Sequence, residues 1–295
     1  MVDPGLMDKR EQHIRQYYKL KTVLQKYREI EKQGTWDSII VPPDFVLKPG
    51  DSSEVVAKIR TRLFQTGDIT EDSGRQLYGY ALQQAVLKFK KRTGYTLDKK
   101  ILPKHIAEMN VPVSVRIKTI IVNMERFRWI PPDLTKAKEY IVVNIPSYRL
   151  NYYKEGKMAL TSNVVVGTTM NKTVVFSGMM SFIVFSPYWN VPQNIIKKEI
   201  LPEMEKDKNY LSKHNMEWNG GNIRQKPGPR NSLGLVKFLF PNTNNIYLHD
   251  TPSKSLFASE KRAFSHGCIR VEKPVELANL ILKEDPLWTP EKIDK

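Results

Sequence analysis

The spacing of apolar residues changes partway along the chain, and this change limits the folds that the sequence can adopt. Up to about residue 130 apolar residues recur every three or four positions, which is the period of an amphipathic helix. From Glu139 they alternate instead, as they do in half-buried strands. The sequence therefore predicts an α+β protein in which a helical part is followed by a mostly β part.

Glycines and prolines divide the helical part into separate helices. An amphipathic stretch over residues 8–32 predicts a long helix that packs on the rest of the fold. Gly67 and Gly94 each follow an apolar helical pattern, as glycines at helix C-termini do. Pro103 and Pro112 each stand where a further helix is expected to start.

These patterns predict four regions. Residues 1–35 hold an N-terminal scaffold helix, residues 36–110 a small helical module, and residues 111–137 a connecting helix and linker. Residues 138–295 form a mostly β domain whose strand pattern is interrupted at about 193–232. A polar insertion with helical character between strands is typical of a lid over a binding cleft.

Short alternating segments predict the strands of the β domain. A turn at Glu155-Gly156-Lys157 has the composition of a hairpin and joins two of them. The predicted strands are Tyr140–Ile145, Leu150–Tyr153, Met158–Val166, Met180–Ser186, Ser232–Phe240 and Ile246–Leu248.

Cys268 is the single cysteine of the chain, so it cannot form an intramolecular disulfide. Its neighbours indicate reactivity, because a thiol attacks as the thiolate and a nearby imidazole can take its proton. His249 and His266 lie in the same short window, and Arg270 adds positive charge that favours a thiolate. Gly267 lacks a Cβ, which lets the backbone present the Cys268 amide to a developing oxyanion.

His249 is the better candidate for the base. It ends the apolar run Ile246–Leu248, and two adjacent strands could bring it to Cys268 from its position far upstream. Asp250 could orient the imidazole through its carboxylate or through its backbone carbonyl. His266 stands two residues before the cysteine, and we expect it to shape the turn.

This region resembles the signature of the L,D-transpeptidases, whose catalytic unit is the YkuD domain. The matching residues are His249-Asp250-Thr251-Pro252 and Arg262-Ala263-Phe264-Ser265-His266-Gly267-Cys268-Ile269-Arg270-Val271. The extended motif, with the residues on both sides of the histidine and the cysteine, resembles the motif of the larger Gram-negative branch of the family. That branch also carries a peptidoglycan-binding domain and a mobile capping segment, which the resemblance places at the predicted lid.

The resemblance implies a reaction. Cys268 would attack the amide between diaminopimelate and the terminal D-alanine of a tetrapeptide stem, and D-alanine would leave. An amine of a second stem would then resolve the acyl-enzyme and join two diaminopimelate residues. Peptidoglycan stems are therefore the expected donor and acceptor, and carbapenems the expected inhibitors. Neither a cofactor nor a metal is expected.

Residues around the motif receive roles in this scheme. His249 would act as base and later as the acid that protonates the leaving amine. The amides of Cys268 and Gly267 and the Tyr247 hydroxyl are expected to stabilise the oxyanion. Arg270 is expected to hold a substrate carboxylate or to organise the loop.

Two further positions are left with alternatives. Ser265 is expected to bond either its own loop or a histidine. Trp189 and Asn190 lie in a loop with two prolines, so they either anchor that loop or line the substrate groove.

The helical module carries a second resemblance. Lys48-Pro49-Gly50-Asp51, Ala85-Val86-Leu87-Lys88-Phe89 and Gly94 are similar to the peptidoglycan-binding module of bacterial wall enzymes. The glutamine that usually follows the phenylalanine is Lys90 here. The module is therefore either a glycan-binding unit or a spacer.

Other interpretations of Cys268 are weaker. A zinc site of His249, His266 and Cys268 would lack a fourth ligand and a familiar ligand spacing. An inert buried cysteine fits poorly with neighbours that are mostly polar. At the level of function, the alternatives are an L,D-carboxypeptidase that uses water as acceptor and a non-catalytic wall-binding protein.

The net charge of +16 and the pI of about 9.7 require an explanation. Nucleic acid is the generic partner of so basic a chain, but no nucleic-acid motif is present, and the anionic cell wall explains the charge as well. The sequence has no run of apolar residues long enough to span a membrane, and its start lacks the apolar stretch of a signal peptide. The resemblance implies the periplasm, so we expect the export signal or anchor to lie outside the sequence given.

Overall fold

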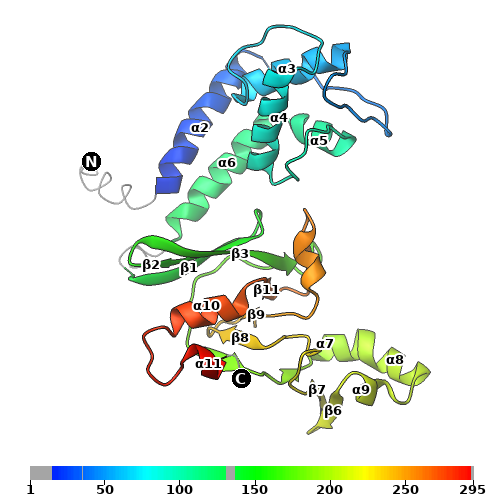
Figure 1. The fold of residues 1–295 in the computed structure, drawn as a ribbon, viewed down its shortest axis with the longest axis vertical. Coiled ribbons are helices and arrows are strands. Elements are labelled where there is room, and N and C mark those ends of the chain that lie inside the picture. The colour runs from blue at the N-terminus through cyan, green and yellow to red at the C-terminus, as the bar shows by residue number, and fades with distance from the viewer. Residues whose placement is uncertain (1–14, 35, 131–136, 294–295) are drawn as a thin grey trace. The chain divides into compact units, whose positions relative to one another are not determined.

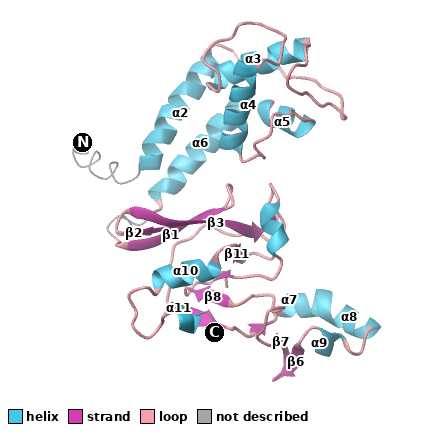
Figure 2. Cartoon of the chain, viewed as in Figure 1, coloured by secondary structure: helices cyan, strands magenta, loops and turns pink. Residues whose placement is uncertain are grey.

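The computed structural model describes residues 15–34, 36–130 and 137–293. The chain divides into two compact units, Met1–Lys136 and Ala137–Lys295. Helices make up the described part of the first unit, and strands with a few helices make up the second (Figure 2). The α+β class predicted from the sequence is thus confirmed.

The helices of the first unit begin and end close to where the sequence predicts. They are α2 (Arg15–Lys32), α3 (Glu54–Thr66), α4 (Tyr80–Thr93), α5 (Pro103–Met109) and α6 (Val113–Arg128) (Figure 1). Gly67 and Gly94 end α3 and α4 with φ of 79° and 81°, the left-handed conformation that glycine adopts without strain. The predicted start of the first helix, at Asp8, lies outside the described residues.

The α2 helix packs on α6, as expected for a helix that belongs to the fold. Leu24 and Tyr27 of α2 are buried against Val113 and Ile117 of α6. A separate core joins α3, α4 and α5, so this unit holds two apolar clusters.

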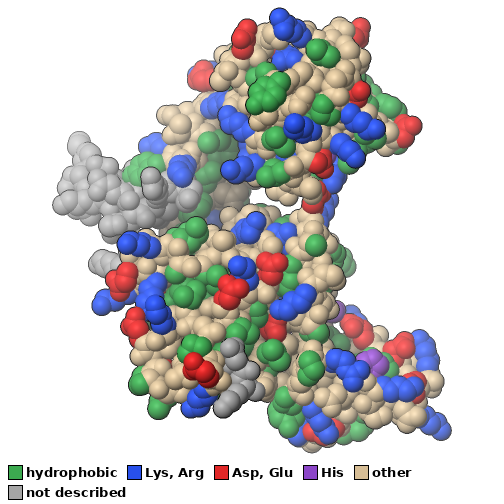
Figure 3. Space-filling model, in the orientation of Figure 1, with side chains coloured by type: hydrophobic (Ala, Val, Ile, Leu, Met, Phe, Trp, Pro, Cys, Tyr) green, Lys and Arg blue, Asp and Glu red, His purple; other side chains and the backbone are tan. Residues whose placement is uncertain are grey.

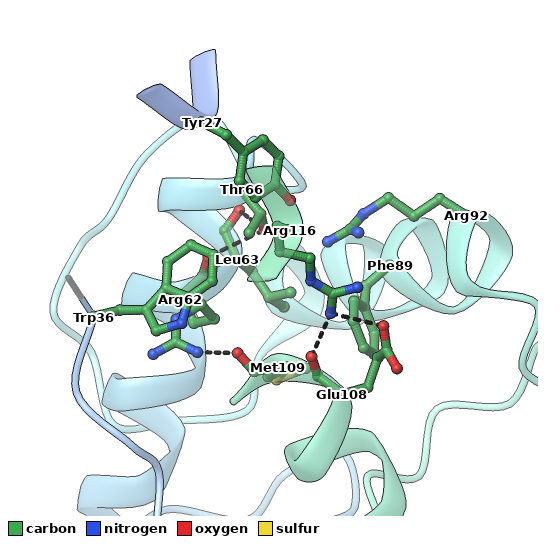
Figure 4. A pocket seen from close by; sticks show the side chains of 10 residues that line it. All are labelled: Tyr27, Trp36, Arg62, Leu63, Thr66, Phe89, Arg92, Glu108, Met109 and Arg116. Atoms are coloured by element: carbon green, nitrogen blue, oxygen red, sulfur yellow. Dashed lines mark hydrogen bonds and ion pairs between the residues drawn. The ribbon is translucent and has the colours of Figure 1, made fainter. Parts of the chain in front are cut away.

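Charged side chains are packed among these helices, around a small hollow (Figure 4). The guanidinium of Arg62 lies 4.3 Å from the ring centre of Trp36 and donates to the carbonyl of Met109. Arg116 donates to the carboxylate of Glu108 at 2.7 Å. Because each guanidinium finds an acceptor, these arginines tie α3, α5 and α6 together.

Lys90 is fully buried, with 0 % of its surface exposed. Its ammonium donates to the Asp98 carboxylate at 2.7 Å and to the Lys100 carbonyl at 2.6 Å. The residue that departs from the peptidoglycan-binding pattern therefore holds the loop that follows α4. It is not placed to contact a glycan strand at the surface.

The second unit is built on a mixed sheet with the strand order β1-β2-β3-β11-β9-β8-β4, and β10 pairs with β3 beside this path. Its strands are β1 (Glu139–Asn144), β2 (Arg149–Lys154), β3 (Lys157–Gly167), β4 (Phe182–Phe185), β8 (Val236–Leu239), β9 (Leu248–His249), β10 (Ala263–Ser265) and β11 (Ile269–Val271). The parallel pair β9 and β11 brings distant parts of the chain together at the centre of the sheet.

One face of this sheet forms the core of the unit. Side chains alternate along a strand, so every second residue points to the same face. The core face is covered by α10 (Pro274–Ile281), and its central residues are Val236, Phe238, Leu248, Ile269 and Val271. The residues between them therefore point to the opposite face.

The segment that was predicted to form a lid folds as a separate group of elements at one side of the second unit (Figure 1). It contains β5 (Trp189–Asn190), α7 (Gln193–Ile195), the π-helical turn η2 (Ile196–Ile200), α8 (Leu201–Lys206), α9 (Tyr210–Lys213), β6 (Met216–Asn219) and β7 (Asn222–Gln225). The helical character was expected, whereas the small sheet β5-β7-β6 was not. Its strands of two to four residues are too short to show alternation.

The predicted strand Ser232–Phe240 is wrong at its start. Residues 232–235 form a turn, and β8 begins only at Val236. Gly234 has a φ of 64°, and a Cβ there would collide with the side chain of Asp250. The Leu235 amide donates to the Asp250 carboxylate at 2.9 Å, so this segment is bonded to a side chain.

The remaining short helices are η3 (Lys254–Ala258) and α11 (Pro290–Ile293). No described helix is both long and apolar enough to cross a membrane. Figure 3 shows Lys and Arg side chains scattered among Asp and Glu over the visible face, in agreement with their scatter along the sequence.

We predict that Lys90→Met destabilises the protein by about 1–3 kcal/mol, because the Lys100 carbonyl and the Asp98 carboxylate lose a charged donor. Lys91→Met, at the exposed neighbouring position, is the matched control and should change stability little. Urea unfolding followed by circular dichroism measures both variants. Equal midpoints for the two variants would contradict a structural role for Lys90.

Candidate active site

Three adjacent strands place polar side chains in a row on the face opposite the core. Lys237 on β8 pairs with His249 on β9, and His249 pairs with Arg270 on β11. Directly paired residues point to the same face, and neighbouring strands lie about 4.8 Å apart. The imidazole of His249 is therefore flanked on both sides by a cation.

A second row lies beside the first. Cys268 stands two residues before Arg270, and Tyr247 two residues before His249, so both point to the same face. The Ile269 amide donates to the Tyr247 carbonyl at 3.1 Å, which holds the two segments together. The Tyr247 side chain is hydrogen-bonded to the Cys268 thiol, and the Lys237 ammonium lies 3.9 Å from the Tyr247 ring centre.

His249 is buried, with 5 % of its surface exposed, and its Nδ1 lies 2.5 Å from the carbonyl oxygen of Asp250. Burial lowers the pKa of the imidazole to about 3, and the charges of Arg270 and Lys237 act in the same direction. The ring is therefore neutral at physiological pH. Nδ1–H donates to the carbonyl, which leaves Nε2 as the proton acceptor that a general base needs.

Asp250 orients the imidazole through its backbone carbonyl, one of the two expected alternatives. Its carboxylate has other partners: it accepts from the Leu235 amide at 2.9 Å and from Lys254 Nζ at 2.5 Å. The side chain of Asp250 thus fixes the turn before β8 and the start of η3, while its main chain holds His249.

The Cys268 thiol is protonated at rest. Burial raises the pKa of this thiol, although the Tyr247 hydrogen bonds and the charges of Lys237 and Arg270 oppose the rise. Sγ lies 3.6 Å from the Asn245 carbonyl oxygen. Among the described hydrogen bonds none joins the thiol to His249.

The loop before Cys268 is held by two hydroxyl groups, one from the loop itself and one from a distant segment. Ser265 Oγ donates to the Cys268 carbonyl at 2.5 Å and accepts from the Gly267 amide at 3.1 Å, so Ser265 bonds the loop and not a histidine. Thr173 Oγ1 donates to the Gly267 carbonyl at 2.7 Å. Gly267 has a φ of 119°, a conformation in which any side chain would be strained.

These bonds separate the two amides that were expected to meet an oxyanion. The Gly267 amide is engaged by Ser265 within the loop. The described hydrogen bonds of the main chain include no partner for the Cys268 amide. Of the two expected amides, the Cys268 amide is thus the one without a described partner, and its role toward an oxyanion stays a prediction.

His266 connects the loop to the lid. Its Nε2 lies 3.1 Å from a carboxylate oxygen of Glu199, in the π-helical turn η2. Both side chains are about half exposed, 47 % and 54 %, so the contact is weak. It nevertheless joins the element that carries Cys268 to the element that was predicted to cover it.

The structure places Trp189 and Asn190 away from the row of polar residues. Both lie on β5 in the small sheet of the lid, where Trp189 packs on the apolar cluster around Val191 and Ile195. No described contact joins either residue to the Cys268 loop. Trp189 therefore anchors its own segment, and a role in substrate binding stays a prediction.

Three residues of this site were missed by sequence reasoning. Lys237 could have been found, because it interrupts the apolar pair Val236 and Phe238 at the period of a strand. Thr173 and Glu199 could not be found from the sequence, because no motif or apolar spacing in their segments indicates that they lie near Cys268. Within the described residues no group of three or more His, Cys, Asp or Glu is placed to hold a metal ion.

A thiol and a neutral imidazole on neighbouring strands are the groups that thiol-dependent acyl-transfer enzymes use. The family model of the L,D-transpeptidase catalytic domain, YkuD, matches residues 138–288. The chain belongs to this family. The resemblance noted in the sequence is confirmed at the level of the family.

A relative from Haemophilus influenzae, named provisionally as an L,D-transpeptidase, is 40% identical over 191 residues. The match covers 58% of this chain but only 38% of the relative, so the chain spans less than half the length of that protein.

Solved structures are more distant. The carbamoyl enzyme of Ldtfm with avibactam is 18% identical, with a TM-score of 0.29 over 46% of this chain and 41% of that one. An L,D-transpeptidase of Xylanimonas cellulosilytica is 15% identical, with a TM-score of 0.23 over 84% and 94%. Both scores are too low to support an argument.

We predict the pH profile of Cys268 alkylation from these pKa directions. A raised thiol pKa means less thiolate at any given pH, so the iodoacetamide rate should keep rising beyond the ordinary thiol pKa of about 8.5. No inflection from His249 is expected near neutral pH, because its imidazole stays neutral. Tyr247→Phe removes a hydrogen bond that lowers the thiol pKa, so its curve should move to higher pH.

Intact-mass spectrometry follows this reaction cleanly, because the chain has one cysteine. A rate that is already constant from acidic pH upward would indicate a resting thiolate–imidazolium pair and would contradict the prediction.

We predict that Glu199→Ala loosens the lid. A contact between two half-exposed side chains contributes at most about 1 kcal/mol, so amide hydrogen exchange in residues 193–213 should accelerate by up to about fivefold. Glu205→Ala removes an exposed carboxylate of α8 and is the matched control. Hydrogen-exchange mass spectrometry compares the two, and identical exchange would show that the His266 contact does not restrain the lid.

Proposed function

We propose that the protein is an L,D-transpeptidase that cross-links peptidoglycan stems through an acyl-enzyme on Cys268. The observation that carries the proposal is the buried, neutral imidazole of His249, held by the Asp250 carbonyl on the strand next to the chain's sole thiol. Catalytic hydrogen bonds are often long or misaligned before substrate binds, so the present orientation of the thiol is compatible with this role.

In the proposed reaction His249 Nε2 takes the thiol proton as Sγ attacks the carbonyl carbon of the diaminopimelate–D-alanine amide. The Cys268 amide and the Tyr247 hydroxyl stabilise the oxyanion. When the C–N bond breaks, the imidazolium gives its proton to the departing D-alanine nitrogen. An amine of a second stem then attacks the thioester, forms the new amide and returns the thiol.

The stems of peptidoglycan are the proposed donor and acceptor, and carbapenems the proposed inhibitors. Because these substrates belong to the cell wall, we place the enzyme in the periplasm or cell envelope. The +16 net charge supports contact with an anionic wall polymer. The helical unit is proposed to act as a spacer or a wall-binding module, and Lys90 supplies its internal support.

Product analysis on a disaccharide-tetrapeptide tests the proposal. We predict a cross-linked dimer and free D-alanine from the wild type, and neither from Cys268→Ala. His249→Gln removes the base and should lower the rate by about 10²–10⁴-fold. His214→Gln makes the same change at an exposed histidine of the lid and should leave the rate close to that of the wild type.

The alternatives give different results in the same assay. Free tripeptide without dimer would identify an L,D-carboxypeptidase that uses water as acceptor. A wild type that forms neither a product nor a covalent carbapenem adduct by intact mass would identify a non-catalytic wall-binding protein.

A further inference from the structure

Two cations lie beside Cys268, and no carboxylate of the described residues is paired with either of them. Lys237 and Arg270 flank His249 on the sheet face that also carries the thiol. Neither forms an ion pair with a carboxylate among the described residues, and Cys268 is the acidic group whose charge acts on both. The Asp250 carboxylate, which is close in sequence, is taken by Lys254.

This arrangement is costly for the free protein. Burial lowers the pKa of the Lys237 ammonium and of the Arg270 guanidinium. Arg270 Nε is buried and lacks a hydrogen-bond partner. Charges that are removed from water without a counter-ion destabilise a fold, so a pair of them at one site indicates that an anion binds there.

We propose that Lys237 and Arg270 bind the free C-terminal carboxylate of the donor peptide and thereby restrict attack to the last amide of the stem. The inference rests on the proposed function, because it concerns the peptide that Cys268 would cleave. It assigns Lys237, which lies outside the Cys268 motif, as a specificity-determining residue.

The dimensions of the peptide fit this assignment. Cys268 and Arg270 are two residues apart on one segment, about 6–7 Å along the chain. The carboxylate of the leaving residue lies one residue beyond the attacked carbonyl, about 3.8 Å on. The long side chains of Lys237 and Arg270 can reach that position, whereas one more residue would carry the carboxylate away from both.

The position of the cations also separates this role from oxyanion stabilisation. The oxyanion forms on the attacked carbonyl, where the Cys268 amide is unpaired and Tyr247 is already bonded to the thiol. The cations stand in the neighbouring row with His249, on the side where the imidazole would meet the leaving nitrogen. A carboxylate attached to that leaving group comes to the same side.

Alkylation of the single cysteine tests the anion site without any turnover. At one fixed pH the thiolate fraction is the same for iodoacetate and iodoacetamide, so the ratio of their rates reports how well a carboxylate is attracted. We expect this ratio for the wild type to exceed that of glutathione by about tenfold and to fall with added salt.

Lys237→Met should bring the ratio close to the glutathione value, and Lys237→Arg should restore most of it. Lys157→Met removes a lysine at the exposed start of β3 and should leave the ratio unchanged. A wild-type ratio equal to that of glutathione, or one insensitive to salt and to Lys237→Met, would overturn the proposal. The salt dependence of the wild type decides the matter even if Lys237→Met fails to fold.

A pair of donor peptides tests the substrate assignment. We expect the wild type to prefer a tetrapeptide with a free C-terminus over its C-terminal amide, and Lys237→Met to reduce that preference in kcat/KM by about 10- to 100-fold. The variant should also lose some rate on the amide, because the Lys237 charge lowers the thiol pKa, but its loss on the free acid should be larger by that factor. An equal loss on both peptides would overturn the assignment, since it would show that Lys237 serves the reaction and not the carboxylate.

The two assays can fail separately. Absence of turnover by the wild type on both peptides would refute the proposed function, and the alkylation ratio would still decide for or against the anion site.

Discussion

The site depends on the parallel pairing of β9 with β11. His249 and Cys268 are brought to one sheet face only because Leu248 pairs with Ile269 and His249 with Arg270. A shift of one residue would turn the polar residues into the core and Leu248 and Ile269 out to the site. The apolar residues of these short strands therefore fix the register that positions the reactive groups, and burial beneath α10 supplies the energy.

Burial on this sheet face keeps both the thiol and the imidazole neutral. His249 is enclosed between two cations, so an added proton would be opposed by burial and by both charges. Cys268 is half-buried, so its ionisation is opposed by burial and helped by those charges. Both groups are therefore uncharged at neutral pH, and in the proposed mechanism the proton moves when the sulfur attacks a carbonyl carbon.

The sequence predicted the parts of the structure that are set by the spacing of apolar residues or by glycines and prolines at the ends of elements. The helices of the first unit were found because Gly67, Gly94 and Pro103 mark where helices end or begin. Helix propensity alone would not define these positions. The strand before His249 was overestimated at its start, as was the one with the central Gly234. Both begin late because a side chain takes the place of ladder hydrogen bonds: Asn242 bonds the main chain of Ile246, and the Asp250 carboxylate accepts from the Leu235 amide.

The candidate site was predicted as far as the motif extended. His249, Cys268 and their neighbours are recognisable as residue types with a chemistry. Thr173 and Glu199 reach the loop through tertiary contacts from segments without a pattern, so a single sequence could not identify them. Lys237 is an intermediate case. The alternation of its strand places it on the face opposite the core, but the sequence does not show which other residues share that face.

A neutral resting thiol also suits an anionic substrate. If Cys268 were a thiolate before substrate arrived, its charge would neutralise Lys237 and Arg270, the two cations on which it acts. A carboxylate approaching the site would then meet a negative sulfur and two satisfied cations. With the thiol protonated, both cations stay available to an incoming carboxylate, and in the proposed mechanism the sulfur becomes charged only after the peptide is in place. Burial outweighs the two cations in setting the thiol pKa, so the same enclosed site keeps the thiol protonated and leaves the cations for the proposed anion.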